Sequence, residues 1–264
     1  MVVTALSIAG SDPSGGAGIQ ADLKAFFARG VYGCAVPTAL TVQTARGVRG
    51  TKPVDPGQVA NQVDAVLEDA GVRAVKLGML VNAPIVRAVA KSLARYPDLP
   101  VVLDPVITSS SGSRLLDDHG LWAITEVLLP RARLVTPNAD EASFLSRMPV
   151  RNEAEAREAA LAIQALGAQA VLVKGGHLSA GPAADVLFDG VEFHIFESPR
   201  LDIPRTHGTG CLLSAVITAE LAKGASTFDA VAAAKSAMVR ALERGFMAAG
   251  NVLLPDPFAL ADVD

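Results

Sequence analysis

The sequence predicts an α/β fold of three layers, with helices on both faces of a mostly parallel sheet. Three observations lead to this prediction. Short apolar runs alternate with longer helical patterns, capping residues mark the helices, and no linker interrupts the alternation. The chain has 264 residues, of which 50% are hydrophobic, and this is enough to bury one large core. We therefore expect a single domain over residues 1–264.

The expected strands are nearly continuous apolar runs, which is typical of parallel strands that are covered on both faces. They are Val2–Ala9, Cys34–Val42, Ala74–Gly78, Val101–Asp104, Arg133–Thr136 and Ala170–Lys174. Between residues 181 and 197 the pattern changes to two shorter runs, Asp185–Phe188 and Glu192–Phe196. These two runs predict a small antiparallel hairpin at one edge of the sheet.

Start and stop signals define the helices between the strands. Three helices begin with an N-cap and a partner three residues later, namely Asp55 with Gln58, Asn152 with Glu155, and Ser226 with Asp229. Pro56 also stands at the first helical position, which favours a helix start. Gly71 and Gly167 follow the first two helices, where a left-handed residue ends a helix.

Composition and charge exclude several classes of protein. Half of the residues are apolar, which excludes a disordered chain, and the net charge of −4 argues against a nucleic-acid binder that relies on basic surface. Cys34 and Cys211 make no disulfide framework. The first ten residues lack the basic segment of a signal peptide, and no run approaches the roughly 20 apolar residues of a membrane span. We expect a cytoplasmic protein.

The glycine-rich loop Gly10–Gly18 follows the first expected strand and leads into a helix. It is too long for a dinucleotide fingerprint and lacks the lysine of a Walker loop. We interpret its backbone, starting at Gly10, as the floor of a site for a small polar ligand, although a plain surface loop is the alternative. Asp22, one turn into the helix, would point toward that ligand, unless it is an ordinary solvated acid.

The segment Thr206–Ala215 carries the strongest signal. Gly208, Thr209 and Gly210 would expose consecutive N–H groups where a long helix begins, and such a pocket stabilises an anion or developing negative charge. Cys211 lies in the first turn, where the helix can lower the pKa of a thiol, so it is a candidate base or nucleophile. The alternative is a small buried side chain.

Oxygen-bearing side chains follow two other expected strands. Asn138, Asp140 and Glu141 together suit Mg²⁺, and Asp104 would face the same site. A capped helix start is the alternative for the first three residues, and a turn before proline is the alternative for Asp104.

Lys174 ends a buried strand, where its charge is costly unless it meets an anion such as phosphate. The four histidines, His119, His177, His194 and His207, show no metal-ligand spacing, so we expect surface or loop roles for them. An anion pocket, acids for Mg²⁺ and a strand-end lysine, without a Walker loop, indicate phosphoryl transfer by another architecture.

Several motifs carry a resemblance to a known family. They are Ala9–Lys24, Tyr32–Cys34, Lys76–Met79, Leu103–Val106, Thr136–Asn138, Lys174–His177 and His207–Cys211. In order and spacing they resemble the hydroxymethylpyrimidine/phosphomethylpyrimidine kinases of thiamine biosynthesis, which belong to the ribokinase-like superfamily. The resemblance implies a ribokinase-like fold, dependence on ATP and Mg²⁺, phosphorylation of 4-amino-5-hydroxymethyl-2-methylpyrimidine and then of its monophosphate, and a homodimer.

The resemblance also assigns roles to residues. Cys211 would be the general base, Lys174 would contact phosphates, Gln43 would bind the aminopyrimidine, and Met79 and Val106 would enclose its ring. Without the resemblance, Met79 and Val106 would be taken as ordinary core.

The chain departs from the family at two places. Gln43 is followed by Thr-Ala rather than Asn-Thr, and residues 108–112 contain no lysine; their Ser/Gly composition suits a flap that closes over ATP. A pyridoxal kinase is the nearest alternative function, and a non-catalytic pyrimidine-binding regulator is an alternative of a different class.

Overall fold

The computed structural model describes residues 2–109, 112–176, 183–198 and 205–261. Within these ranges the main sheet has nine strands in the order β3-β2-β1-β4-β5-β6-β7-β8-β9, and β10 and β11 form a separate hairpin. Pairing is parallel from β2 to β7 and antiparallel for β2–β3, β7–β8 and β8–β9. The predicted mostly parallel sheet and its antiparallel edge hairpin are both confirmed.

The strands are β1 (Thr4–Ser11), β2 (Tyr32–Thr44), β3 (Gly47–Pro53), β4 (Val72–Leu77), β5 (Val101–Leu103), β6 (Leu134–Val135), β7 (Val171–Val173), β8 (Ala183–Phe188), β9 (Phe193–Ser198), β10 (Phe246–Ala248) and β11 (Val252–Leu254). The α-helices are α1 (Gly18–Ala28), α2 (Pro56–Asp69), α3 (Ala83–Leu93), α4 (Asp118–Ala123), α5 (Ala139–Ser146), α6 (Glu153–Ala165), α7 (Thr209–Ala222) and α8 (Thr227–Glu243). A π-helical turn, Ile124–Leu128, extends α4.

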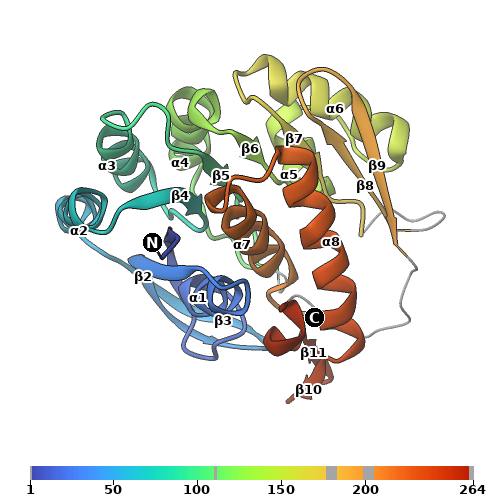
Figure 1. Ribbon diagram of the computed structural model, residues 1–264, viewed down its shortest axis with the longest axis horizontal. Coiled ribbons are helices and arrows are strands. Elements are labelled where there is room, and N and C mark those ends of the chain that lie inside the picture. Colours follow the sequence, from blue (N-terminus) through green and yellow to red (C-terminus); the bar gives the residue numbers. More distant parts are fainter. Residues whose placement is uncertain (1, 110–111, 177–182, 199–204, 262–264) are drawn as a thin grey trace.

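Two hydrophobic cores lie on opposite faces of the sheet. Side chains of α2, α3, α4, α5 and α6 fill one core, and side chains of α1, α7 and α8 fill the other. Figure 1 shows the two groups of helices on either side of the strands. Helix α7 is apolar all round because its neighbours α1 and α8 cover the faces that do not contact the sheet. The layering is therefore the α/β/α arrangement that the sequence predicts.

The predicted helix boundaries are confirmed at each of the three marked starts. The side chains of Asp55, Asn152 and Ser226 accept hydrogen bonds from backbone N–H groups three residues later. Gly71 and Gly167 both have positive φ, at 58° and 116°, as expected after a helix. The structure adds two hairpins that the sequence analysis missed, β2–β3 and β10–β11.

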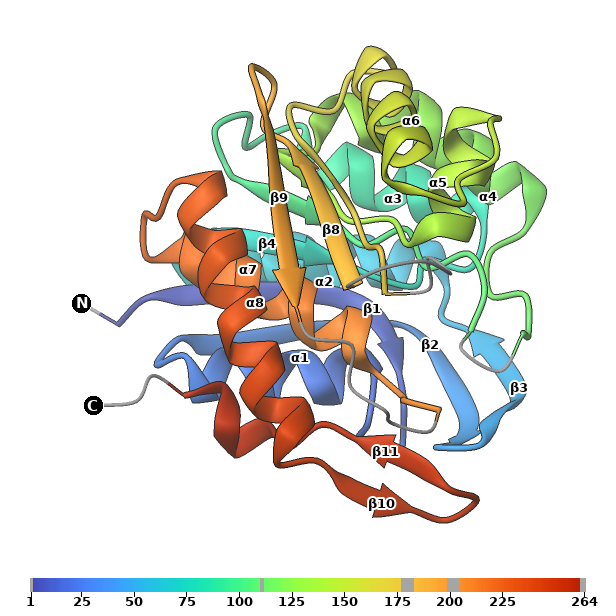
Figure 2. The same ribbon diagram turned by 90° about the vertical axis from the view of Figure 1, so that its right-hand side faces the viewer.

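The strand order changes direction at β1, and this determines where a ligand site can form. The chain leaves β1 through α1 to reach β2 on one side, and later returns through α2 to place β4 on the other side. In open α/β sheets such a reversal leaves a crevice beyond the carboxyl ends of the two strands. Figure 2 shows the β10–β11 hairpin beside the same end of β1 and β2. In the described part of the chain no helix is long and apolar enough to cross a membrane.

Candidate active site

Two glycine-rich loops meet backbone to backbone at the carboxyl end of β1. Gly208 has φ of 79°, and a Cβ atom there would lie 1.7 Å from the carbonyl oxygen of Gly16. A Cβ on Gly16 would in turn lie 2.6 Å from Cδ2 of His207. Because no side chain fits at either position, these glycines allow the first loop to close onto the segment before α7. The structure thus joins the two motifs that the sequence analysis singled out separately.

The N-terminus of α7 opens onto this junction. No side chain caps it, so the N–H groups of Thr209 and its neighbours have no partner from a capping residue. A Cβ on Gly210 would lie 3.1 Å from Nζ of Lys174. The positive end of the helix and a lysine ammonium therefore converge, as expected for an anion pocket.

Cys211 is partly exposed in the first turn of α7. Burial of the thiol raises its pKa to about 11, although Lys76 and the N–H of Gly18 act in the opposite direction. The expectation of a lowered pKa is therefore wrong, because the desolvation of the thiolate outweighs the helix and the nearby lysine. The group is a thiol at neutral pH, and any role as a base requires that its proton leaves at the moment of reaction.

A buried ion pair lies beneath Cys211. Nζ of Lys76 in β4 is 2.6 and 2.8 Å from the two carboxylate oxygens of Asp22, and the hydroxyl of Ser7 donates to the same carboxylate at 2.6 Å. Burial opposes the charge on Lys76, but Asp22 outweighs it and raises the pKa of Lys76. Both side chains are 0% exposed. Asp22 is thus buried beneath the site. The sequence analysis expected its side chain to face a ligand, or else to be an ordinary solvated acid.

A second ionic cluster lies where β5, β6 and β7 end. Nζ of Lys174 is 2.9 Å from Oδ1 of Asp104 and 4.0 Å from Oε2 of Glu141. Thr136 and Ser214 each donate a hydroxyl to Asp104 at 3.2 Å. Burial disfavours the Asp104 carboxylate, but Lys174 and Lys76 outweigh it and lower its pKa. The structure brings Asp104 and Glu141 together and adds Lys174, for which the sequence analysis expected a phosphate as partner.

The same cluster has a donor set that fits Mg²⁺. Glu141 is nearly buried, and this burial raises its pKa to about 7, with a further contribution from Asp104. Two carboxylates share one ammonium here, so the cluster lacks positive charge, and oxygen donors are those that Mg²⁺ prefers. Asn138 and Glu141 also form a reciprocal capping box at the start of α5. The structural alternative for these two residues is therefore present, and the backbone N–H groups of Asn138 and Ile107 hold the Glu141 carboxylate beside Lys174.

Gln43 reaches the first loop through a histidine. Nε2 of His207 lies 2.9 Å from Oδ2 of Asp12 and 3.4 Å from Nε2 of Gln43. Asp12 also accepts the N–H groups of Ser14 and Ala17, each at 2.9 Å. The His207 side chain is 7% exposed, so of the expected surface or loop roles this histidine has a loop role, and it is buried. His177 lies outside the described residues.

Met79 and Gly10 lie in contact at the ends of β4 and β1. A Cβ on Gly10 would be 3.0 Å from the Met79 sulfur, and the hydroxyl of Thr38 donates to the Met79 carbonyl at 2.6 Å. Met79 is buried, whereas Val106 is partly exposed after β5. Both are therefore near the predicted site without polar groups of their own, which suits an apolar wall. The expected flap at residues 108–112 includes positions outside the described residues.

The sequence analysis missed Lys76, Asp12 and His207 as parts of the site. A lysine in the middle of an apolar strand needs a buried partner, so the reasoning applied to Lys174 would also have found Lys76. Asp12 interrupts a glycine loop and His207 directly precedes the glycine at the helix start. Their pairing joins residues 195 positions apart, and no local pattern indicates it.

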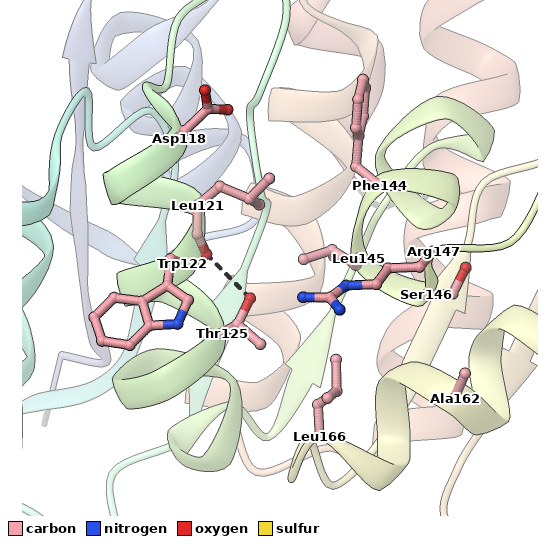
Figure 3. Close-up of a pocket in the computed structure, with 10 residues that line it drawn as sticks. All are labelled: Asp118, Leu121, Trp122, Thr125, Phe144, Leu145, Ser146, Arg147, Ala162 and Leu166. Carbon is pink, nitrogen blue, oxygen red and sulfur yellow. Dashed lines mark hydrogen bonds between the residues drawn. The ribbon is translucent and has the colours of Figure 1, made fainter.

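A separate surface pocket of about 460 Å³ lies in the outer layer between α4, α5 and α6, as Figure 3 shows. Trp122, Phe144 and Leu166 contribute apolar surface, and the hydroxyl of Thr125 donates to the Leu121 carbonyl at 3.0 Å. Its lining contains none of the candidate site residues described above. We therefore place the chemistry at the glycine loops.

The chain matches a family model described as phosphomethylpyrimidine kinase over residues 12–254. It is 46% identical over 247 residues to a hydroxymethylpyrimidine/phosphomethylpyrimidine kinase of Streptomyces coelicolor, covering 94% of this chain and 91% of that protein. It is also 47% identical over 237 residues to a thiamine biosynthesis bifunctional protein of Geobacter sulfurreducens. That match covers 90% of this chain but only 48% of the bifunctional protein.

Among solved structures, an ADP complex of Bacillus subtilis pyridoxal kinase superimposes with a TM-score of 0.90. The two proteins share 39% sequence identity, and the match covers 98% of this chain and 99% of the other. The fold is therefore that of this pyridoxal kinase, whose solved structure contains ADP.

Proposed function

The chain belongs to the phosphomethylpyrimidine kinase family, and from this premise we propose that it is a kinase of thiamine biosynthesis. The hydroxymethyl oxygen of 4-amino-5-hydroxymethyl-2-methylpyrimidine accepts a phosphoryl group from ATP. The resulting monophosphate accepts a second phosphoryl group, which gives the pyrophosphate. The observation that carries this proposal is the convergence of the α7 N-terminus with Lys174, which forms an anion pocket beside Cys211.

The pocket residues have distinct tasks in the transfer. The N–H groups of Gly208–Cys211 stabilise charge that develops on the transferring phosphoryl group, because they point there before the reaction starts. Lys174 contacts the phosphates, which would replace part of its present interaction with Asp104. Cys211, in the first turn of α7, would take the proton of the acceptor hydroxyl, and the charge of Lys76 would stabilise the thiolate that forms.

Mg²⁺ bound with ATP would supply positive charge between the phosphates during transfer. Asp104, Glu141 and Asn138 would hold it, in part through water. Gln43 would bind the aminopyrimidine through its amide, and Met79 and Val106 would enclose the ring.

An assay of ADP release with the hydroxymethylpyrimidine as acceptor tests the proposal. The similarity to a pyridoxal kinase favours pyridoxal as the second acceptor to compare. Faster turnover of pyridoxal would replace the proposal with pyridoxal kinase activity. Binding of either compound without release of ADP would indicate a regulator.

We also propose a homodimer in the cytoplasm. The family resemblance supports the dimer, and light scattering after size exclusion tests it. Two free cysteines, Cys34 and Cys211, suit a reducing compartment, and cell fractionation tests the location.

A further inference from the structure

A continuous row of polar side chains connects the first loop to the amide of Gln43. Asp12 contacts His207, His207 contacts Gln43, and Gln43 contacts Thr41, with distances of 2.9, 3.4 and 3.1 Å. Each member has few partners, so the direction of one hydrogen bond determines the direction of the next.

The direction begins at Asp12. Its carboxylate already accepts two backbone N–H groups, and although burial disfavours its charge, His207 and Ser14 outweigh burial and hold its pKa below the ordinary value. An ionised carboxylate only accepts hydrogen bonds. Nε2 of His207 therefore carries a hydrogen atom and donates a hydrogen bond to Asp12.

The proton on Nε2 determines which end of the Gln43 amide fits beside it. An amide nitrogen facing His207 would set an N–H group against another N–H group at 3.4 Å. Thr41 gives an independent indication. Its single proton is donated to the Ser11 carbonyl at 2.8 Å, so its oxygen can only accept from Gln43.

Both contacts become favourable when the Gln43 amide is rotated by half a turn about its Cγ–Cδ bond. The N–H group at Nε2 of His207 then makes a bifurcated hydrogen bond, to Asp12 and to the Gln43 oxygen. The Gln43 nitrogen donates a hydrogen bond to the Thr41 hydroxyl oxygen. Amide oxygen and nitrogen are assigned from their hydrogen-bond partners, and here two unrelated partners agree.

We propose that Asp12 and His207 are positioning residues that fix the Gln43 amide with its oxygen toward His207, and thereby select an acceptor ring that carries an amino group next to a ring nitrogen. This inference rests on the proposed function, in which Gln43 binds the pyrimidine. The outer edge of the fixed amide offers one acceptor and one donor in a defined order. The amino group and ring nitrogen of the aminopyrimidine offer the complementary order, as adenine does to glutamine.

The keto analogue is the sharpest probe of this order. When the exocyclic amino group is replaced by a keto oxygen, the ring nitrogen carries a proton, so donor and acceptor exchange places while size and shape hardly change. A fixed amide rejects this analogue, because both pairs would become repulsive. An amide that is free to turn accepts both compounds.

The test compares kcat/KM for the amino and keto acceptors in the wild type, His207→Phe and Asp12→Asn. Phenylalanine keeps the ring packed on Gly16 but removes the donor. In Asp12→Asn the new amide nitrogen can donate a hydrogen bond to an unprotonated Nε2 of His207. Nε2 is then an acceptor, so the Gln43 amide can turn its nitrogen toward it. We expect the preference for the amino compound to fall by about 10- to 100-fold in both variants.

Lys24→Ala is the matched control. Lys24 donates to the Gly15 carbonyl of the same loop at 2.7 Å and, within the described part of the chain, makes no hydrogen bond to His207 or Gln43. Its loss loosens the loop, and the amino-to-keto preference should stay that of the wild type. Equal losses with both acceptors in His207→Phe and Asp12→Asn, with the preference intact, would overturn the inference and leave the proposed function standing. Failure of the wild type to phosphorylate the amino compound would instead overturn the proposed function.

A measurement on the wild type does not depend on the folding of any variant. Nitrogen-15 NMR of the histidine rings reports which nitrogen carries the proton. We expect a protonated Nε2 in His207, and an unprotonated Nε2 would refute the proposed direction of the network.

Discussion

Replacement of Lys76 by methionine should destabilise the protein strongly, because it leaves the Asp22 carboxylate buried without its cation. Both side chains are 0% exposed, and Nζ contacts both carboxylate oxygens, at 2.6 and 2.8 Å. Removing one partner of such a pair costs about 3–5 kcal/mol. For a chain of this size that corresponds to a fall in Tm of about 6–20 °C.

Thermal and denaturant unfolding of Lys76→Met and of the double variant Asp22→Asn/Lys76→Met measure this effect. The double variant removes the buried charge and keeps an acceptor for Ser7, so it should recover more than half of the loss. The loss in the single variant should also shrink as the pH falls. The unpaired Asp22 has a raised pKa in the folded state, so folding takes up a proton and stability declines as the pH rises above about 4. A loss below about 1 kcal/mol, or a double variant no better than the single one, would refute a charged pair.

Three further predictions concern the site. Cys211→Ala should lower kcat by about 100-fold or more. Because the thiol pKa is about 11, wild-type kcat/KM should also rise with pH between about 7 and 9. A plateau of kcat/KM in this pH range, or near-wild-type turnover of the variant, would exclude the thiolate as base. Gln43→Ala should raise KM for the pyrimidine much more than KM for ATP, and equal increases would contradict its assignment. Gly208→Ala should lower kcat/KM by about 100-fold, because a Cβ 1.7 Å from the Gly16 oxygen forces the loops apart. Gly71→Ala is the control, because Gly71 also has a positive φ but a Cβ there would have no neighbour within 4 Å. It should cost only about 1–2 kcal/mol of stability. Unchanged activity in Gly208→Ala would refute the close-contact argument.

The layers of the fold could be predicted because the signals for them are local. Apolar runs locate the parallel strands, and caps such as Asp55 and Asn152 locate helix starts to within a residue. Strand β3 could not be recognised in this way. Its residues Gly47–Pro53 are mostly exposed and form no apolar run, and only pairing with β2 makes them a strand.

The site could be predicted in part, for a similar reason. Residues that follow strand ends, such as Asp104 and Lys174, meet because parallel strands end at one edge. The pKa of Cys211 could not be predicted, because it depends on how deeply the surrounding chain buries the thiol. The pairing of Asp12 with His207 depends on the closure of two loops that are far apart in the sequence and meet at the end of β1.

That closure has a consequence for how the protein matures during synthesis. Asp12 and His207 are separated by 195 positions, so at typical bacterial and eukaryotic rates of about 5–20 residues per second the ribosome needs on the order of 10–40 s to make the second after the first. The early strands can already pair in that interval, whereas the pocket needs both the first loop and the segment that precedes α7. A polypeptide that stops before His207 can therefore form the early strands but not the anion pocket, and phosphoryl transfer has to wait until the N-terminus of α7 has been made.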